Sequence, residues 1–178
     1  MLKNYKRLEW STANTIETEL RDKLILLSLL QYKKLYVHGM HGPDTFDCAG
    51  LVWFLYHELF NINIYDNGFG LSTTTKIMTS SYGKITLFEE KSLYKDLSII
   101  KKGDILFFHR QSKGDNIPKV DNKYPGHCGI YLSDNKFIHC SRPKGMVVIS
   151  NFNCEYWKKV LVGSKNIISD YRILDLKN

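Results

Sequence analysis

Apolar residues near the start of the chain recur with the period of an α-helix. Between residues 15 and 35 they lie three or four positions apart, at Ile16, Leu20, Leu24, Leu27 and Leu30. Glu17 and Glu19 fall in the first turn of this stretch, where acidic side chains favour the start of a helix. We therefore predict an amphipathic helix over residues 15–35.

A second apolar stretch predicts another helix, which begins at Asp47 or Cys48 and ends near Phe60. The loop before it, residues 38–45, contains two glycines and a proline. The pattern between this helix and residue 100 is mixed. In that region we predict short helical pieces around residues 73–79 and 90–97.

From residue 103 onward, short runs rich in apolar residues replace the helical period. They predict strands at residues 104–109, 127–132, 136–141, 146–150 and, closing the sheet, 167–174. A long polar loop, residues 111–126, separates the first two strands. Helices followed by strands predict an α+β fold, in which N-terminal helices pack on a central antiparallel sheet.

Size, charge and cysteine content narrow the possible classes. The 178 residues suit one domain, and we expect an N-terminal helical arm, residues 1–30, packed on a main domain, residues 31–178. Lys and Arg number 25 against 18 Asp and Glu, but they are scattered, so we expect no nucleic-acid partner. No apolar run suits a transmembrane segment or a secretion signal, so we expect a cytoplasmic protein as the chain is given. We expect the four cysteines to be free thiols. We expect no organic cofactor. The sequence does not predict the oligomeric state.

Cys48 opens the second predicted helix, in the segment FDCAGLV of residues 46–52. Apolar residues that share one face of this helix follow it: Leu51, Val52, Leu55 and Leu59. The free N–H groups and the positive dipole end at a first helical turn favour a thiolate over a thiol. Gly50 removes side-chain bulk, which we expect to leave room for a substrate backbone beside the sulfur. Cys48 is therefore a candidate nucleophile, although a lone cysteine at a helix start is more often a small buried apolar residue.

A cysteine nucleophile needs a base, and the base needs a third group to orient it. The candidate histidines are His38, His41, His109, His127 and His139. His57 lies about half a helical turn away from Cys48 and is excluded. Residues 126–140 predict a β-hairpin with its turn at 133–135, which carries two of the candidates on neighbouring strands. We predict an odd number of residues in the hairpin loop, because only then do His127 and His139 face the same side.

The dipeptide His-Cys occurs twice in this hairpin, at residues 127–128 and 139–140, and also suggests a zinc site. Adjacent strand residues face opposite sides, so the histidines would line one surface and the cysteines the other. That arrangement is poor for a tetrahedral ion. We therefore predict no metal site and expect Cys128 and Cys140 to face the core.

Four segments, spread over about residues 30–160, together resemble the NlpC-type cell-wall cysteine peptidases, a papain-like family that cleaves peptidoglycan stem peptides. The segments are residues 36–39, 46–52, 102–108 and 127–139. Their order is similar to the family pattern, as are the twelve-residue intervals from Tyr36 to Cys48 and from His127 to His139. The resemblance implies a papain-like α+β catalytic domain over residues 31–178.

The resemblance also implies a role for each matching residue. Cys48 would be the nucleophile, His127 the base and His139 the third member of a Cys-His-His triad. Tyr36 would lie beside the sulfur and bind or polarise the substrate, and Asp47 would face the substrate's amino end. The implied reaction is hydrolysis of an amide bond in a peptidoglycan stem peptide, between D-glutamate and a diamino acid.

Three features depart from the family pattern. Ala49 stands in place of the usual serine, which removes one polar contact to a substrate amine. Met40 stands in place of a second glycine and is expected to narrow the loop beside Cys48. Loop 111–126 is long for the family, and a lid, a specificity wall and a solvated loop are all open interpretations.

Two other functions remain open on the sequence. The same thiol and imidazoles could serve a thiol acyltransferase or thioesterase, because these reactions use the same thioacyl intermediate. A catalytically silent wall-binding module, or a zinc-supported module, is the alternative from another class. An enzyme acting on the wall would need non-classical delivery, as a phage-borne or effector protein, or a leader that the given sequence lacks.

Overall fold

The structure, a computed structural model, describes residues 2–64, 73–88, 96–109, 125–151 and 154–170. Four helices lie in these ranges: α1 (Leu2–Leu29), α2 (Cys48–Phe60), α3 (Thr73–Thr79) and α4 (Glu155–Val160). The same ranges contain eight strands: β1 (Leu35–Tyr36), β2 (Thr45–Phe46), β3 (Lys84–Leu87), β4 (Ile105–Phe108), β5 (His127–Ser133), β6 (Lys136–Ser141), β7 (Met146–Asn151) and β8 (Leu161–Asn166).

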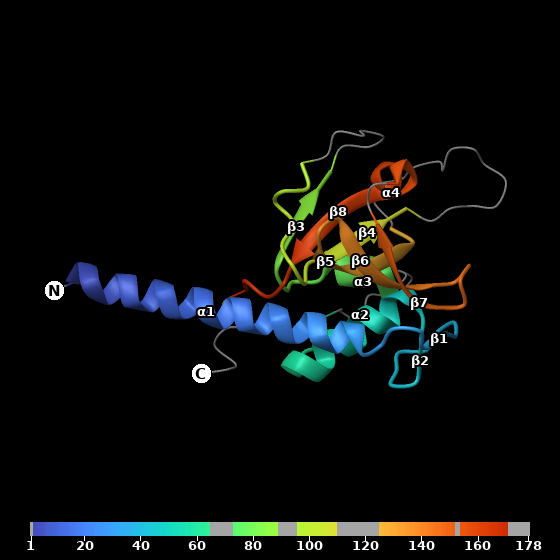
Figure 1. Cartoon of the computed structure of the whole chain (residues 1–178), viewed down its shortest axis with the longest axis horizontal. Helices are drawn as coiled ribbons and strands as arrows, with labels where there is room; N and C mark the ends of the chain where they lie inside the picture. The colour runs from blue at the N-terminus through green and yellow to red at the C-terminus, as the bar shows by residue number, and fades with distance from the viewer. Residues whose placement is uncertain (1, 65–72, 89–95, 110–124, 152–153, 171–178) are drawn as a thin grey trace.

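The strands form one sheet in the order β2-β1-β7-β6-β5-β4-β8-β3. All neighbouring pairs are antiparallel except β1 and β2, which are parallel. The sheet is curled, and α1 and α2 lie along one side of it while α4 lies at the other (Figure 1). The predicted α+β fold, with N-terminal helices on a largely antiparallel sheet, is confirmed.

Strand alternation divides the buried apolar residues between the two faces of the sheet. On the helix side, Phe107 packs in a large cluster with buried residues of α2, among them Leu51 and Leu55. On the other side, its neighbour Phe108 packs in a smaller cluster with Phe137. Partly buried aromatic residues of α4 cover that second cluster, which is the one that lies next to the predicted histidines.

Several predicted elements agree with the structure, and two do not. The helices predicted at 47–60 and 73–79 and the strands at 104–109, 127–132, 136–141 and 146–150 are present with small shifts of their ends. The first helix runs from Leu2 to Leu29 and not over 15–35, because residues 30–33 form a turn in which Lys33 has a φ of 67°. The strand predicted at 167–174 is wrong over its described part, residues 167–170: β8 ends at Asn166, and Asp170 N donates to Ile167 O to close a turn.

Other predictions fall where little or nothing is described. Most of the helical piece at 90–97 and nearly all of loop 111–126 lie outside the described ranges, as do residues 171–174. Helix α4 and the short strands β1, β2 and β3 were not predicted. None of the helices in the described part of the chain is long and apolar enough to cross a membrane.

Helix α1 is fastened to the sheet by a buried arginine. Arg21 is 5% exposed and forms an ion pair with Asp104, which stands just before β4, at 3.1 Å. The guanidinium also donates to Asn166 and Ser169 at 3.0 Å each, and to the carbonyl of Lys102. Burial raises the pKa of Asp104 to about 6, against the opposing effects of a hydrogen bond from Lys101 N and the charge of Arg21.

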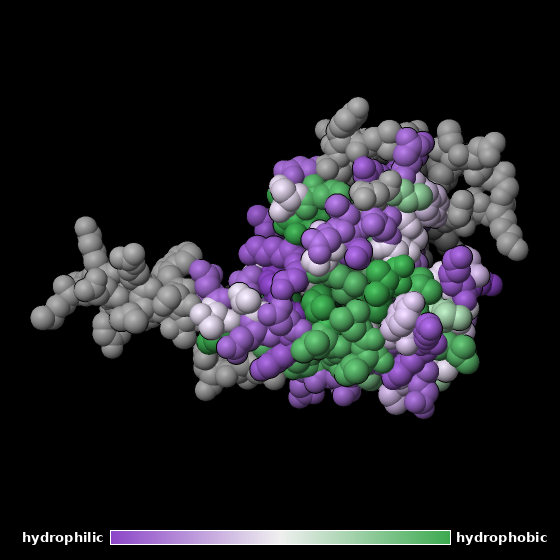
Figure 2. Space-filling view, in the orientation of Figure 1, coloured by the Kyte–Doolittle hydropathy of each residue, from purple (hydrophilic) through white to green (hydrophobic). Residues whose placement is uncertain are grey.

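The surface of α1 is also apolar beyond its contact with the sheet. Leu26, Leu29 and Leu30 are 64%, 41% and 73% exposed. Figure 2 shows green, hydrophobic surface over the C-terminal end of this helix. The packing of α1 in the core therefore leaves these leucines at its C-terminal end uncovered.

We expect Arg21→Ala to lower the free energy of unfolding by about 3–5 kcal/mol, because it leaves the buried Asp104 carboxylate without its partner. The loss should be larger at pH 8 than at pH 5. Asp104 has a folded pKa of about 6 and an unfolded pKa of about 3.9. The stability that this carboxyl contributes therefore falls as pH rises through the folded value. At pH 5 Asp104 is largely neutral and loses little without Arg21, whereas at pH 8 it is charged and would be left unpaired. Urea unfolding at the two pH values measures both effects.

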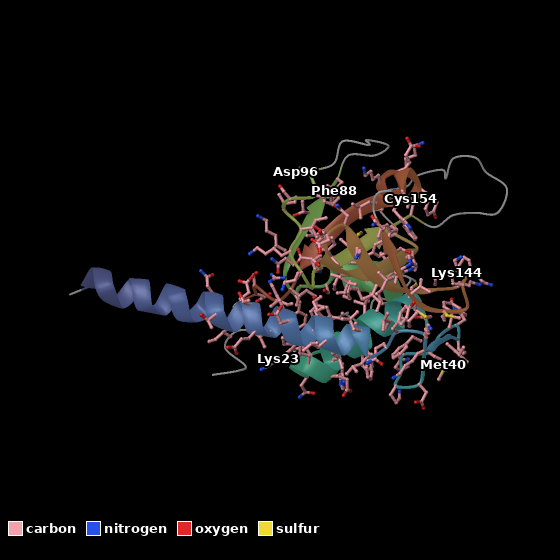
Figure 3. All side chains as sticks on the ribbon, viewed as in Figure 1. Lys23, Met40, Phe88, Asp96, Lys144 and Cys154 are labelled. Atoms are coloured by element: carbon pink, nitrogen blue, oxygen red, sulfur yellow. The ribbon has the colours of Figure 1, made fainter. Side chains whose placement is uncertain are left out.

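The matched control is Lys23→Ala on the same helix. Lys23 is exposed and projects from the side of α1 away from the sheet (Figure 3). Its loss should change the free energy of unfolding by less than about 0.5 kcal/mol. Equal losses for the two variants would contradict the assigned role of Arg21.

Candidate active site

Helix α2 begins at Cys48 because Asp47 caps it. The Asp47 Oδ1 atom accepts a hydrogen bond from Gly50 N at 2.7 Å, which satisfies one of the free N–H groups of the first turn. The Oδ2 atom accepts from Gly39 N at 3.0 Å, and Asp47 N donates to Met40 O at 2.7 Å. Asp47 therefore ties the loop of residues 38–42 to the helix start. Its role at a substrate's amino end stays a prediction.

Gly50 is required by this loop and not by a substrate. A Cβ atom on Gly50 would lie 2.1 Å from Met40 O and 2.8 Å from the Cα of His41. The prediction that Gly50 leaves room for a substrate backbone is therefore wrong, because the protein's own loop fills that space. The Met40 side chain is 43% exposed and lies at the edge of the molecule (Figure 3), so backbone contacts, and not this side chain, hold the loop close to α2.

Cys48 is half-buried and surrounded by hydrogen-bond donors. The Cys128 side chain lowers the pKa of Cys48 most, and burial opposes it. The Cys128 thiol donates to the backbone carbonyl of Cys48 at 3.4 Å. A hydrogen bond and charge interaction with His127, and a hydrogen bond with Thr74, lower that pKa further, so that it lies well below the ordinary value for a cysteine. Burial and the neighbouring sulfur raise the pKa of Cys128. The preferred state of the pair is a thiolate at Cys48 and a thiol at Cys128.

The hairpin of β5 and β6 brings the two predicted histidines together. His127 Nε2 lies 2.8 Å from His139 Nδ1, and the ring planes are nearly perpendicular, at 82°. Since Nε2 of His127 is occupied by His139, its Nδ1 is the nitrogen left for the sulfur. The prediction that the two histidines face the same side is confirmed.

The reason they do so differs in part from the prediction. The turn itself holds two residues, Asp134 and Asn135, with φ angles of 49° and 59°, which is typical of a type I′ hairpin. The pairing shifts by one residue between Tyr131 and Ser133, so that Leu132 forms a β-bulge. The odd residue that puts the histidines on one side is therefore in the strand and not in the turn.

His139 is almost fully buried, with 2% of its surface exposed. Burial and the charge of His127 lower the pKa of His139 to about 3, so its ring is neutral near pH 7. Phe137 stacks on it at 4.9 Å between ring centroids, and Trp157 of α4 contacts it edge-on at 5.2 Å. The remaining nitrogen, Nε2, lies 2.9 Å from Ser150 Oγ on β7.

Tyr36 lies on β1, beside this group. Burial raises the pKa of its hydroxyl, and the negative charges of Cys48 and Asp47 raise it further. The role that the resemblance gives Tyr36, beside the sulfur and in contact with the substrate, stays a prediction.

The other histidine candidates lie elsewhere. The His38 side chain is 89% exposed, and His41 packs against the edge of Trp53. His57 stacks on the same tryptophan, 4.6 Å between centroids. His109 is buried after β4, and its backbone N donates to Val160 O.

Sequence patterns missed four residues of the site. They are Thr74, Cys128, Ser150 and Trp157, which contact Cys48 or the two imidazoles. Cys128 alone had a signal in the sequence, since it follows His127 and faces the core side of the sheet, where it is fully buried as predicted. Among the described residues, no group of three His, Cys, Asp or Glu side chains is placed to hold a metal ion.

A sequence profile of the NlpC/P60 family matches residues 33–166, which is most of the chain. The chain belongs to the NlpC/P60 family. The matched range begins after α1 and contains Cys48 and both imidazoles of the site.

Curated relatives share between a quarter and a third of their residues with this NlpC/P60 chain. "Probable endopeptidase YafL" of Escherichia coli is 29% identical over 145 residues, which are 81% of this chain and 49% of the relative. "Murein DD-endopeptidase MepH" of the same organism is 27% identical over 140 residues, 78% of this chain and 43% of the relative. The chain thus spans about half the length of these relatives.

Solved structures of the family share the fold. NlpC2 from Trichomonas vaginalis is 26% identical with a TM-score of 0.59, over 83% of this chain and 47% of that one. The NlpC/p60 domain of the peptidoglycan hydrolase SagA has a TM-score of 0.56 at 20% identity, over 82% of this chain and 97% of that one. RipD from Mycobacterium tuberculosis, described as a non-catalytic NlpC/p60 domain protein, has a TM-score of 0.53 at 14% identity, over 83% of this chain and 97% of that one.

We expect the rate at which iodoacetamide alkylates Cys48 to fall less steeply from pH 8 to pH 6 than that of an ordinary cysteine, because the lowered pKa of Cys48 keeps more of it as thiolate. For a cysteine with the ordinary pKa of about 8.5, the rate falls about tenfold for each pH unit over this range. Exposed Cys154 is the internal comparison. Peptide mapping by mass spectrometry reports both sites in one sample.

Cys128→Ala should slow alkylation of Cys48 at pH 6, since it removes the donor that lowers the pKa most. Cys140→Ala is the matched control, because that buried thiol donates to Phe46 O at 3.2 Å, whereas the Cys128 thiol donates to Cys48 O at 3.4 Å. A pH profile for Cys48 that follows that of Cys154 would refute a stabilised thiolate.

Proposed function

We propose that this NlpC/P60 chain is a cysteine peptidase that hydrolyses an amide bond in peptidoglycan stem peptides, with Cys48, His127 and His139 as its catalytic triad. The observation that carries the proposal is the 2.8 Å contact of His127 with a buried, neutral imidazole, while its other nitrogen is left for a sulfur of lowered pKa. The order of the groups, nucleophile to base to orienting residue, is that of a thiol protease. The endopeptidase names of the curated relatives support the same class.

The reaction would proceed in two steps at one carbonyl. The Cys48 thiolate attacks the carbonyl carbon, and the imidazolium of His127 gives a proton to the leaving amine as the C–N bond breaks. Water then attacks the thioacyl intermediate, and His127 takes a proton from it. The C–S bond breaks, which restores the thiolate and releases a carboxylic acid.

The first turn of α2 would hold the oxyanion. The leading N–H groups of a helix have no carbonyl partner within it, and Gly50 N is already used by Asp47. The Cys48 N–H is therefore the backbone donor closest to the reacting carbon. Tyr36 has a hydroxyl whose pKa is raised by burial, so it stays protonated and able to donate.

The family resemblance also suggests which bond of the stem peptide is cleaved. Asp47 would receive the amino end of the substrate, and the cleaved bond would join D-glutamate to a diamino acid. One relative, "Gamma-DL-glutamyl hydrolase" of Bacillus subtilis, is 26% identical over 77 residues, 43% of this chain and 17% of the relative, and its name describes a glutamyl bond. Ala49 is 3% exposed and packs in the core, so it contributes no polar contact to this end of the site.

The lowered pKa of Cys48 favours an enzyme over a silent binding module, because binding alone has no need of a thiolate. A thiol acyltransferase would share the thioacyl intermediate and differ only in its acceptor. Digestion of purified peptidoglycan fragments, followed by mass analysis, separates these cases. Hydrolysed products carry a new carboxyl group, whereas transfer to an added amine gives an amide.

We expect Cys48→Ala and His127→Ala to abolish product formation while the protein stays folded, since they remove the nucleophile and the base. His139→Ala should retain activity lowered by about 100-fold, and His139→Asn should lose less, because an amide oxygen can still accept from His127. Turnover of a muropeptide mixture, with circular dichroism to check folding, measures these effects.

His57→Ala is the control, since this histidine stacks on Trp53, away from the proposed triad. Full activity of His139→Ala would remove His139 from the mechanism. Full activity of Cys48→Ala would end the proposal as a whole.

A further inference from the structure

The line of hydrogen bonds does not end at the third member of the proposed triad. His139 Nδ1 faces His127, and His139 Nε2 faces Ser150 Oγ at 2.9 Å. Strand β7 carries this serine in a fixed register, with Val148 opposite His139 and Ser150 opposite Phe137. Because residues opposite each other share a face, Ser150 lies diagonally next to His139 on the same side of the sheet.

The neutral ring of His139 carries a single proton, which can lie on either nitrogen. When Cys48 is a thiolate and His127 an imidazolium, both nitrogens of His127 carry hydrogen. The Nε2–H of His127 then points at His139 Nδ1 across 2.8 Å. Two N–H groups cannot face each other at that distance, so the ion pair requires the proton of His139 to be on Nε2.

A proton on Nε2 of His139 needs an acceptor. The ring is 2% exposed and lies between Phe137 and Trp157, neither of which has an acceptor to offer. The Ser150 hydroxyl is the acceptor that the structure records for this nitrogen. Ser150 is half-buried, so its own hydrogen has room to point toward water while its oxygen accepts.

We propose that Ser150 is a positioning residue, which accepts the Nε2–H of His139 and so holds the tautomer that can accept from the imidazolium of His127. The inference rests on the proposed function for its effect on turnover, but the tautomer itself is a property of the folded protein. Ser150 does not touch the substrate. It acts through His139 on His127.

Nitrogen-15 NMR of the histidine side chains tests the tautomer without any substrate. In wild-type protein near pH 7 we expect His139 to carry its hydrogen on Nε2 and a bare lone pair on Nδ1. In Ser150→Ala the signals should shift toward the Nδ1–H form, and Ser150→Thr, which keeps the hydroxyl, should restore the wild-type pattern. A wild-type ring protonated on Nδ1 would overturn the proposal.

Kinetics test the consequence. Ser150→Ala should lower kcat about tenfold with KM nearly unchanged, because a lost partner for a buried N–H disfavours the ion pair and leaves substrate contacts intact. It should also slow alkylation of Cys48 at pH 6, and Ser150→Thr should recover most of both. Ser133→Ala is the matched control, since this serine lies at the far end of the hairpin and bonds to Asp134.

Each outcome decides a different question. If Ser150→Ala changes kcat and alkylation no more than Ser133→Ala, Ser150 has no positioning role. If Ser150→Ala does not fold, the wild-type NMR pattern and the Ser150→Thr variant still decide the point. If wild-type protein cleaves no muropeptide but its NMR pattern is as expected, the proposed function fails while the tautomer assignment stands.

Discussion

The hydrogen bond between the imidazoles of His127 and His139 is the contact on which the rest of the site depends. It exists because a two-residue turn is combined with one bulged residue, Leu132. Without the bulge, the tight turn at Asp134 and Asn135 would pair His139 with a residue of the opposite face, and its ring would enter the core between sheet and helix. One extra residue in a strand therefore decides whether the protein has a base with an orienting partner.

The sulfur is held by contacts that are distant in sequence. Asp47 and the loop before it fix the start of α2, and Cys128 approaches Cys48 from β5, 3.4 Å from its carbonyl oxygen. Helix α3 brings Thr74 to the same place. The end of that helix is fixed by Lys165 of β8, which is 1% exposed and donates from Nζ to carbonyl oxygens at the helix C-terminus, where a cation is favourable. The lowered pKa of Cys48 is thus a product of several elements and not of the helix dipole alone.

The sequence predicts those features of the fold and the site that have a local cause. Helix α2 and the hairpin were predicted because apolar periodicity and turn residues mark them. Strand β8 was not predicted, because its central residues are Gly163, Ser164 and Lys165, which do not form an apolar run. Gly163 is needed there since a Cβ would lie 2.5 Å from Thr86 O of the neighbouring strand, and Lys165 is buried only because α3 supplies its acceptors. The contacts of Thr74 and Ser150 with the site arise likewise from packing between elements, which no local pattern records.

The choice of a neutral group as the orienting residue fits its surroundings. A thiolate and an imidazolium together carry no net charge, and the ring of His139 adds none, since its pKa is about 3. A carboxylate in its place would be buried among Phe137 and Trp157, and taking such a charge out of water costs several kcal/mol unless further donors satisfy it. Imidazole avoids that cost but introduces a different requirement, because it accepts from His127 in only one of its two tautomers. Because aromatic side chains enclose His139, the Ser150 hydroxyl at its Nε2 atom is needed for His139 to accept from the base, His127.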